Sequence, residues 1–168
     1  MNEPFLCAMA TFDAETKEKI SGFRRQLLSL GFTGRQSKHL PPHITLGIFR
    51  PEQKEDAKLC TQKAAEQSKA FSLFFRHIGI FSGANVLFLA PDRTEELLFL
   101  HSFFGTAEEF APHVTLLSDK PSSVYAALPY IADVFHPFQG MVSDIQLYEF
   151  HPAKSVLSVT LKNNTNMV

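Results

Sequence analysis

The sequence is short of the residues that mark metal-binding, disulfide-rich and membrane proteins. Its 168 residues include two cysteines and no tryptophan. Cys7 and Cys60 have the spacing of neither a zinc motif nor a disulfide framework, so we expect buried free thiols. No apolar run approaches the roughly 18 residues of a spanning helix, and the N-terminus lacks the basic region and cleavage site of a signal peptide. These absences predict a cytoplasmic protein without membrane contact.

The sequence also lacks an excess of charge of either sign. A formal net charge of −1 gives no general attraction to nucleic acid or to anionic membranes, so any phosphate must be bound by a local site. The 45% hydrophobic and 20% charged residues are an ordinary globular balance. We therefore expect residues 1–168 to form a single domain and the protein to be a monomer.

Apolar runs and helical periodicity predict the element order β-α-β-α-β-β-α-β-α-β-β. Asp13 is a good N-cap for the first helix, and Asp92 with Glu95 forms a capping-box pattern for the third. Pro129 is expected to kink or end the fourth helix. The predicted strands are residues 5–12, 43–49, 71–81, 86–90, 113–117, 139–150 and 156–162, and the helices begin near residues 13, 51, 92 and 121.

A five-residue motif occurs twice. Residues 42–46 read Pro-His-Ile-Thr-Leu and residues 112–116 read Pro-His-Val-Thr-Leu. Internal duplication is the obvious cause of such a repeat. A strand–helix–strand–helix–strand unit also occurs twice without a linker between the copies, which predicts two pseudo-symmetric lobes within one domain.

Each motif places a histidine and a threonine on one face of a strand. Side chains alternate across a strand, so His43 points with Thr45, and His113 points with Thr115. One imidazole can take a proton from a nucleophile while the other gives one to a leaving oxygen. The hydroxyls can donate hydrogen bonds to phosphate oxygens as charge gathers in the transition state. The motifs therefore predict phosphoester chemistry without metal or cofactor.

Paired His-x-Thr-x motifs on short strands resemble the two-histidine phosphoesterase superfamily, which includes the 2′-5′ RNA ligase-like proteins. The resemblance implies an α+β fold of two lobes, each with an antiparallel sheet and helices outside, and an active-site cleft between the sheets. It implies activity without metal on 2′,3′-cyclic phosphates, 2′-5′ linkages or related nucleotide phosphoesters, with a nucleotide or short RNA end as partner. By carry-over the catalytic residues are His43, Thr45, His113 and Thr115.

One position departs from the family pattern. Ligase-like members commonly carry an arginine five residues after the second histidine, where this chain has Ser118. That departure leaves the phosphate contact and the RNA end as substrate open. The residues considered for substrate binding are Arg35, Lys38, Arg50, Lys120 and, for base stacking, Phe49. For Phe49, core packing is the competing interpretation.

Simpler readings compete with each of these assignments. An isolated histidine at a strand end is more often structural than catalytic, and the matched repeat is what favours catalysis. His39 lies close to His43, but two histidines without further ligands do not make a zinc site. His77, His101, His136 and His151 are read as structural or exposed, because none has a threonine two residues later.

Three functions are compatible with the motifs. The first is a cyclic phosphodiesterase, in which water attacks the phosphorus. The second runs the reverse chemistry as an ATP-independent 2′-5′ RNA ligase, which the charge balance and Ser118 disfavour. The third is a non-catalytic nucleotide-binding module, which the retention of all four motif residues disfavours. The sequence does not decide which histidine is the base.

Overall fold

A computed structural model describes residues 3–35, 39–106, 108 and 110–163 of the chain. The element order is the predicted one, with a short 3-10 turn before the second helix. The strands are β1 (Phe5–Phe12), β2 (His43–Phe49), β3 (Phe71–Phe81), β4 (Val86–Pro91), β5 (Val114–Ser118), β6 (Phe138–Phe150) and β7 (Lys154–Thr160). The helices are α1 (Ala14–Ser29), α2 (Lys54–Gln67), α3 (Glu95–His101) and α4 (Pro121–Val134).

The strands form one antiparallel sheet of seven strands in the described chain. Its order is β2-β1-β6-β3-β4-β5, and β7 pairs with β6. Strand β6 joins the two halves, because residues 138–142 pair with β3 and residues 142–150 pair with β1. The α+β class is confirmed. Two separate sheets were predicted, however, and the length of β6 makes them continuous; the division into two lobes stays a prediction.

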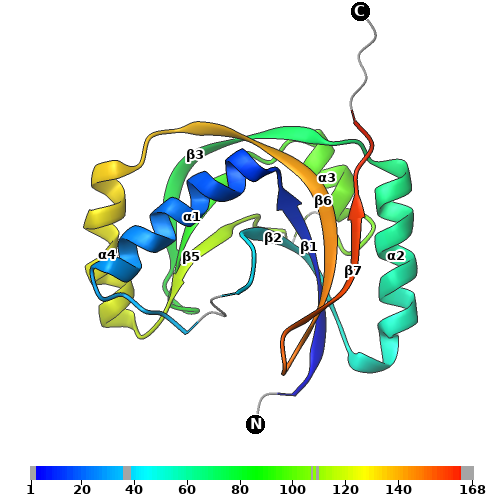
Figure 1. The fold of residues 1–168 in the computed structure, drawn as a ribbon, viewed down its shortest axis with the longest axis horizontal. Coiled ribbons are helices and arrows are strands. Elements are labelled where there is room, and N and C mark those ends of the chain that lie inside the picture. The colour runs from blue at the N-terminus through cyan, green and yellow to red at the C-terminus, as the bar shows by residue number, and fades with distance from the viewer. Residues whose placement is uncertain (1–2, 36–38, 107, 109, 164–168) are drawn as a thin grey trace, which may run out of the picture.

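The sheet is strongly curved, so its edge strands β2 and β5 approach each other in the middle of the molecule (Figure 1). Two of the helices pack against a strand from the other half of the chain. Helix α1 follows β1 in the chain but packs also against β5, and α3 precedes β5 but packs against β2. Each strand that carries a His-x-Thr-Leu motif is thus supported by a helix from the other half of the chain.

Most helix-boundary predictions hold, with two corrections. The Asp13 carboxylate accepts a hydrogen bond of 2.9 Å from the backbone N–H of Thr16, as expected of an N-cap. Helix α3, however, is capped by Thr94 rather than Asp92, which pairs with Arg76 at 2.7 Å instead. Helix α4 continues through Pro129 without ending there.

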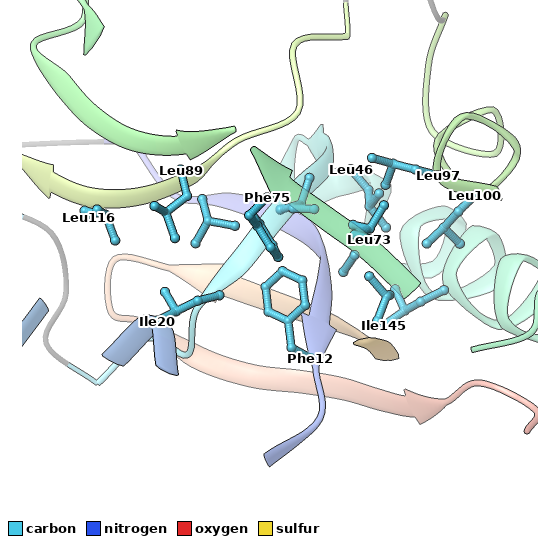
Figure 2. Close-up of a cluster of buried hydrophobic side chains, with 14 of the residues drawn as sticks. Phe12, Ile20, Leu46, Leu73, Phe75, Leu89, Leu97, Leu100, Leu116 and Ile145 are labelled. Atoms are coloured by element: carbon cyan, nitrogen blue, oxygen red, sulfur yellow. The ribbon is translucent and has the colours of Figure 1, made fainter. Parts of the chain in front are cut away.

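The hydrophobic core lies between the helices and the sheet (Figure 2). Phe12 and Phe75 meet edge to face near its centre, with ring centroids 5.8 Å apart. Leu46 from the first motif lies near Leu97 of α3, and Leu116 from the second motif lies nearer α1 (Figure 2). Both motif strands are therefore anchored by their apolar faces.

Cys7 is buried, as predicted, whereas Cys60 is only half-buried; both thiols are free. Among the described residues, no helix has the length and apolar character needed to cross a membrane.

Candidate active site

The two motifs meet at the facing edges of the curved sheet. The residues that alternate with the motif histidines and threonines, Ile44 and Leu46 on β2 and Val114 and Leu116 on β5, are fully buried. The histidines and threonines themselves keep part of their surface exposed. The alternation predicted from the sequence is thus present in both copies.

Two adjoining pockets hold the four motif residues. The first, here called the His43 pocket, has a volume of about 610 Å³ and is lined by Arg24, Arg35, His43, Thr45, Thr115 and Ser118, among others. The second, the His113 pocket, has a volume of about 450 Å³ and is lined by Thr45, Gly47, Phe81, His101, Phe104 and His113, among others. Because Thr45 and Ile48 line both, the pockets adjoin at Thr45.

Both histidines are held in the same way. His43 Nδ1 lies 2.9 Å from the carbonyl oxygen of Pro41, and His113 Nδ1 lies 2.8 Å from that of Ala111. A carbonyl only accepts, so Nδ1–H donates and Nε2 is the atom left for proton transfer. The prolines between, Pro42 and Pro112, favour extended backbone just before each histidine. This explains why the repeat includes its proline.

The surroundings of the two rings differ. Burial lowers the pKa of His43 to about 4, and the charges of Arg24 and His113 act in the same direction, against the hydrogen bond to Pro41. His43 is therefore neutral near pH 7. His113 instead meets aromatic edges, with Phe81 at 4.9 Å and Phe88 at 5.6 Å between ring centroids.

Arg24, on α1, connects the second motif to the segment just before the first. Its Nε and Nη2 donate to the carbonyl oxygen of Thr115 at 3.1 and 2.7 Å, and its Nη1 donates to that of Leu40 at 3.2 Å. Burial lowers the pKa of its guanidinium. Arg24 is not among the site residues predicted from the sequence. The available signal was its position four residues after Ile20, on the inward side of the helix.

Cys7 is a second residue of the site that is not among those predicted from the sequence. Its Sγ lies 3.9 Å from Thr45 Oγ1, and burial raises the pKa of the thiol to about 11. The protonated thiol can therefore act as a weak donor to the Thr45 hydroxyl, which leaves the hydroxyl proton available to a substrate oxygen.

The residues predicted to bind substrate differ in whether they line one of the two pockets. Arg35 lines the His43 pocket; its backbone N–H donates to the carbonyl oxygen of Ser118 at 2.7 Å, and its guanidinium lies 3.7 Å from Asp119. Arg50 and Lys120 are not among the residues that line either pocket. Lys38 lies outside the described residues.

Phe49 does not line either pocket. It packs against the core and meets Phe104 edge to face, with ring centroids 6.3 Å apart. The aromatic residues that do line the His43 pocket include Phe5 and Phe150, which are stacked with centroids 4.7 Å apart. They are cross-strand partners on β1 and β6, a pairing that the sequence alone does not reveal.

Within the described residues, no group of three or more His, Cys, Asp or Glu side chains is placed to hold a metal ion. The groove formed by the two pockets instead offers two imidazole Nε2 atoms, two hydroxyls and the Arg35 guanidinium. That set can bind a phosphate group and move protons on either side of it.

Comparison with known families decides the class. The sequence model of the 2′-5′ RNA ligase superfamily matches residues 12–153. The chain belongs to this superfamily of two-histidine phosphoesterases. No curated protein sequence matches it.

Several solved structures share its fold. E. coli LigT in complex with ATP superposes with a TM-score of 0.67 at 21% identity, covering 96% of this chain and 99% of LigT. LigT in complex with 3′-AMP gives 0.66 at 21% identity with the same coverage. The protein TT0787 of Thermus thermophilus gives 0.66 at 15% identity, covering 95% and 99% of the two chains. At these identities the likeness concerns the fold.

Proposed function

We propose that this protein is a metal-independent hydrolase of 2′,3′-cyclic phosphates on a nucleotide or short RNA end. The single observation that carries the proposal is the matched pair of histidines. Each has its Nδ1–H held by a carbonyl two residues earlier and its Nε2 left for chemistry, with a threonine two residues later. Proton transfer at both sides of one phosphorus needs such a pair.

The proposed base is His43, because its lowered pKa keeps it neutral near pH 7. Its Nε2 takes a proton from a water molecule as the water oxygen bonds to phosphorus. The bond from phosphorus to one ribose oxygen breaks, and His113 Nε2 donates a proton to that oxygen. The product is a phosphomonoester with a free ribose hydroxyl, and exchange with solvent restores both rings.

Three groups are proposed to stabilise the charge that develops on the phosphoryl oxygens. The Thr45 and Thr115 hydroxyls donate hydrogen bonds from opposite strands, and preorganised donors of this kind contribute about 10²–10³-fold in rate. Arg35 supplies the positive charge, since it lines the same pocket beside Ser118. It thereby takes the place of the arginine that ligase-like relatives carry at that position.

The test is a substrate panel assayed with EDTA present. It contains 2′,3′-cyclic nucleotides, 2′-5′ dinucleotides and other cyclic phosphoesters. The wild-type protein should convert the cyclic nucleotides to monophosphates, and His43→Ala and His113→Ala should each lose at least about 100-fold in kcat. His77→Ala is the matched control, because His77 is exposed on β3 and lines neither pocket.

The panel also separates the alternatives. Full activity of either variant, His43→Ala or His113→Ala, contradicts the proposed mechanism. Formation of 2′-5′ linkages from RNA ends in preference to hydrolysis indicates a ligase. Tight nucleotide binding without turnover of any member of the panel indicates a binding module.

A further inference from the structure

His113 stands beside two phenylalanines that do not belong to the hydrophobic core. Phe88 on β4 is 9% exposed, and Phe81, the last residue of β3, is half-buried. Among the described residues, neither is part of the core cluster or of the side chains packed against it. Core packing, which is the usual reason for a buried phenylalanine, therefore does not explain this pair.

The strand register places both rings on the face of the sheet that carries the second motif. Phe88 pairs with Thr115 across β4 and β5, and with Gly79 across β3 and β4. Directly paired residues share a face of a sheet, and so do residues two positions apart in one strand. Phe81 therefore lies on the same face as Gly79. His113 lies on that of Thr115, and all five positions share one face.

The two rings and the imidazole form one aromatic cluster. Phe81 and Phe88 are stacked, with centroids 4.2 Å apart and an interplanar angle of 25°. The His113 ring is 4.9 Å from Phe81 at an angle of 85°, and 5.6 Å from Phe88 at 63°. Aromatic pairs prefer such edge-to-face arrangements. Together with the Nδ1 bond to the Ala111 carbonyl, these contacts restrict rotation of the imidazole.

A glycine on β3 makes room for the ring of Phe88. A Cβ on Gly79 would lie 2.5 Å from Cζ and 2.9 Å from Cε2 of Phe88, closer than packed atoms can approach. Gly79 does not have a positive φ, so backbone conformation does not require glycine here. Glycine weakens a strand, and in a strand it often marks the close approach of another group. The close approach at Gly79 is that of the Phe88 ring.

At the first motif a methionine takes the place of this phenylalanine. Met9 is the cross-strand partner of Thr45, as Phe88 is of Thr115. Methionine has three rotatable bonds and adapts its shape to its surroundings, whereas a phenylalanine ring is rigid. The rigid partner thus lies beside His113, which is the histidine proposed to donate the proton.

We infer that Phe81 and Phe88 are positioning residues that clamp the imidazole of His113, so that its Nε2 faces the leaving ribose oxygen. This inference rests on the proposed function, which makes His113 the proton donor. The two rings carry no proton and act through the orientation of the imidazole. Proton transfer requires hydrogen-bond geometry, and a misplacement of about 1 Å can cost about 10²-fold in rate.

The kinetic test compares kcat and KM on a 2′,3′-cyclic nucleotide. Phe88→Leu keeps an apolar side chain but removes the ring, and it should lower kcat about tenfold or more with KM within about twofold. Gly79→Ala displaces the ring of Phe88 and should lower kcat too. In the double variant Gly79→Ala/Phe88→Leu the alanine should add almost nothing, because the ring that it displaces is absent.

Phe71→Leu is the matched control. Phe71 is buried on the same strand β3, but it belongs to the core and lines neither pocket of the site. This variant should lower the Tm at least as much as Phe88→Leu and keep the wild-type kcat. If kcat falls equally in Phe71→Leu and Phe88→Leu, the loss reflects general destabilisation and the clamp is refuted.

A second measurement does not depend on turnover. Two-bond ¹H–¹⁵N NMR spectra of histidine-labelled protein are recorded at about pH 9, above the range in which imidazoles titrate. Wild-type His113 should show the Nδ1–H tautomer that its bond to Ala111 selects. In Phe88→Leu and Gly79→Ala the released ring should also populate the Nε2–H tautomer. Phe71→Leu should keep the wild-type tautomer.

The clamp is refuted if Phe88→Leu and Gly79→Ala both keep the wild-type tautomer, or if both keep the wild-type kcat. A wild-type protein that turns over no member of the substrate panel, but whose His113 tautomer changes in both variants, refutes the proposed function and leaves the clamp standing. Turnover with an unchanged tautomer and an unchanged kcat in both variants does the reverse.

Discussion

At the scale of single residues, His43 and His113 share a backbone anchor but differ in what surrounds the ring. Each donates from Nδ1 to a carbonyl two residues earlier. His43 is recessed beside Arg24, whereas His113 stands against the edges of Phe81 and Phe88. The repeated motif thus supplies two imidazoles that are anchored alike. The residues around them are not repeated, so the two rings lie in different environments.

The first prediction concerns the pH dependence of catalysis. With a pKa of about 4, His43 stays neutral down to low pH, so the acid limb of kcat/KM should lie near pH 4. Bound phosphate carries negative charge and raises the pKa of the nearby imidazole, so the acid limb of kcat should lie at a higher pH. Both limbs are measured on a cyclic nucleotide between pH 3.5 and 9. An acid limb of kcat/KM near pH 6.5, the value of an unperturbed imidazole, contradicts the assignment of His43 as the base.

The second prediction concerns the two thiols. Cys7 is buried and its pKa is raised to about 11, so almost none of it is thiolate at pH 8. Cys60 is half-buried on α2. Iodoacetamide at pH 8 should therefore label Cys60 well before Cys7, as followed by peptide mass spectrometry. Preferential labelling of Cys7 would show that its thiol is far more accessible and acidic than its surroundings indicate.

At the scale of elements, Arg24 holds three segments together. From α1 it donates to backbone carbonyls in β5 and in the segment before β2. The third prediction follows from these bonds. Arg24→Leu should lower the free energy of unfolding by about 2 kcal/mol or more, since it removes three charged hydrogen bonds to part-buried carbonyl oxygens. It should also shift the acid limb of kcat/KM upward, because a charge that lowers the pKa of His43 is removed.

Arg25→Leu is the matched control for Arg24. Arg25 is the next residue on α1, its side chain is exposed, and it pairs with Glu18 on the surface. Surface ion pairs contribute at most about 1 kcal/mol. This variant should leave the pH profile unchanged and the denaturation midpoint nearly so. An Arg24→Leu protein with the wild-type pH profile would show that Arg24 has a structural role only.

The order of elements and the four motif positions were predictable because they depend on local pattern. Alternation in residues 43–46 and 113–116 places the motif side chains, and Asp13 caps α1 as its residue type suggests. Arg24 was not recognised, because its contacts depend on which helix packs against which strand. The exchange of α1 and α3 between the halves of the sheet is a property of the tertiary fold.

The wrong cap of α3 has a local physical cause. Asp92 lost the capping position to Thr94 because the Asp92 carboxylate is engaged by Arg76 across the β3–β4 pair. Pro129 was expected to kink or end α4, and it does not end it, because the helix runs from Pro121 to Val134 with the proline inside it. Sequence patterns indicate which residues can cap or end a helix, and tertiary contacts determine which of them does so.

At the scale of the whole molecule, one strand unites the two repeats. Strand β6 pairs with β1 along one part and with β3 along another, so both halves belong to one sheet. The groove between β2 and β5 then depends on the curvature of that sheet. We therefore expect a change at either motif to alter the free energy of unfolding of the whole domain. Lowering the pH protonates His43 and so makes such a change without a mutation.

The fourth prediction is that the free energy of unfolding falls as the pH drops from about 6.5 toward 4. The pKa of His43 is about 4 when folded, against 6.5 for an unperturbed imidazole. Between these values the unfolded chain binds a proton that the folded chain does not, so stability rises with pH and its loss follows acidification. The contribution is at most about 1.4 kcal/mol per pH unit, measured by urea unfolding at each pH.

The variant His43→Gln isolates this contribution, because glutamine does not titrate. Its unfolding free energy should depend less steeply on pH than that of the wild type over the same interval, and the two curves should run parallel above pH 6.5. Other groups that titrate in this range act equally on both proteins and cancel in the difference. Parallel curves over the whole interval would mean that His43 is no less basic in the folded protein than in the unfolded chain. The burial of His43 in the groove would then not set its charge, and the unequal roles assigned to the two histidines would lose their physical basis.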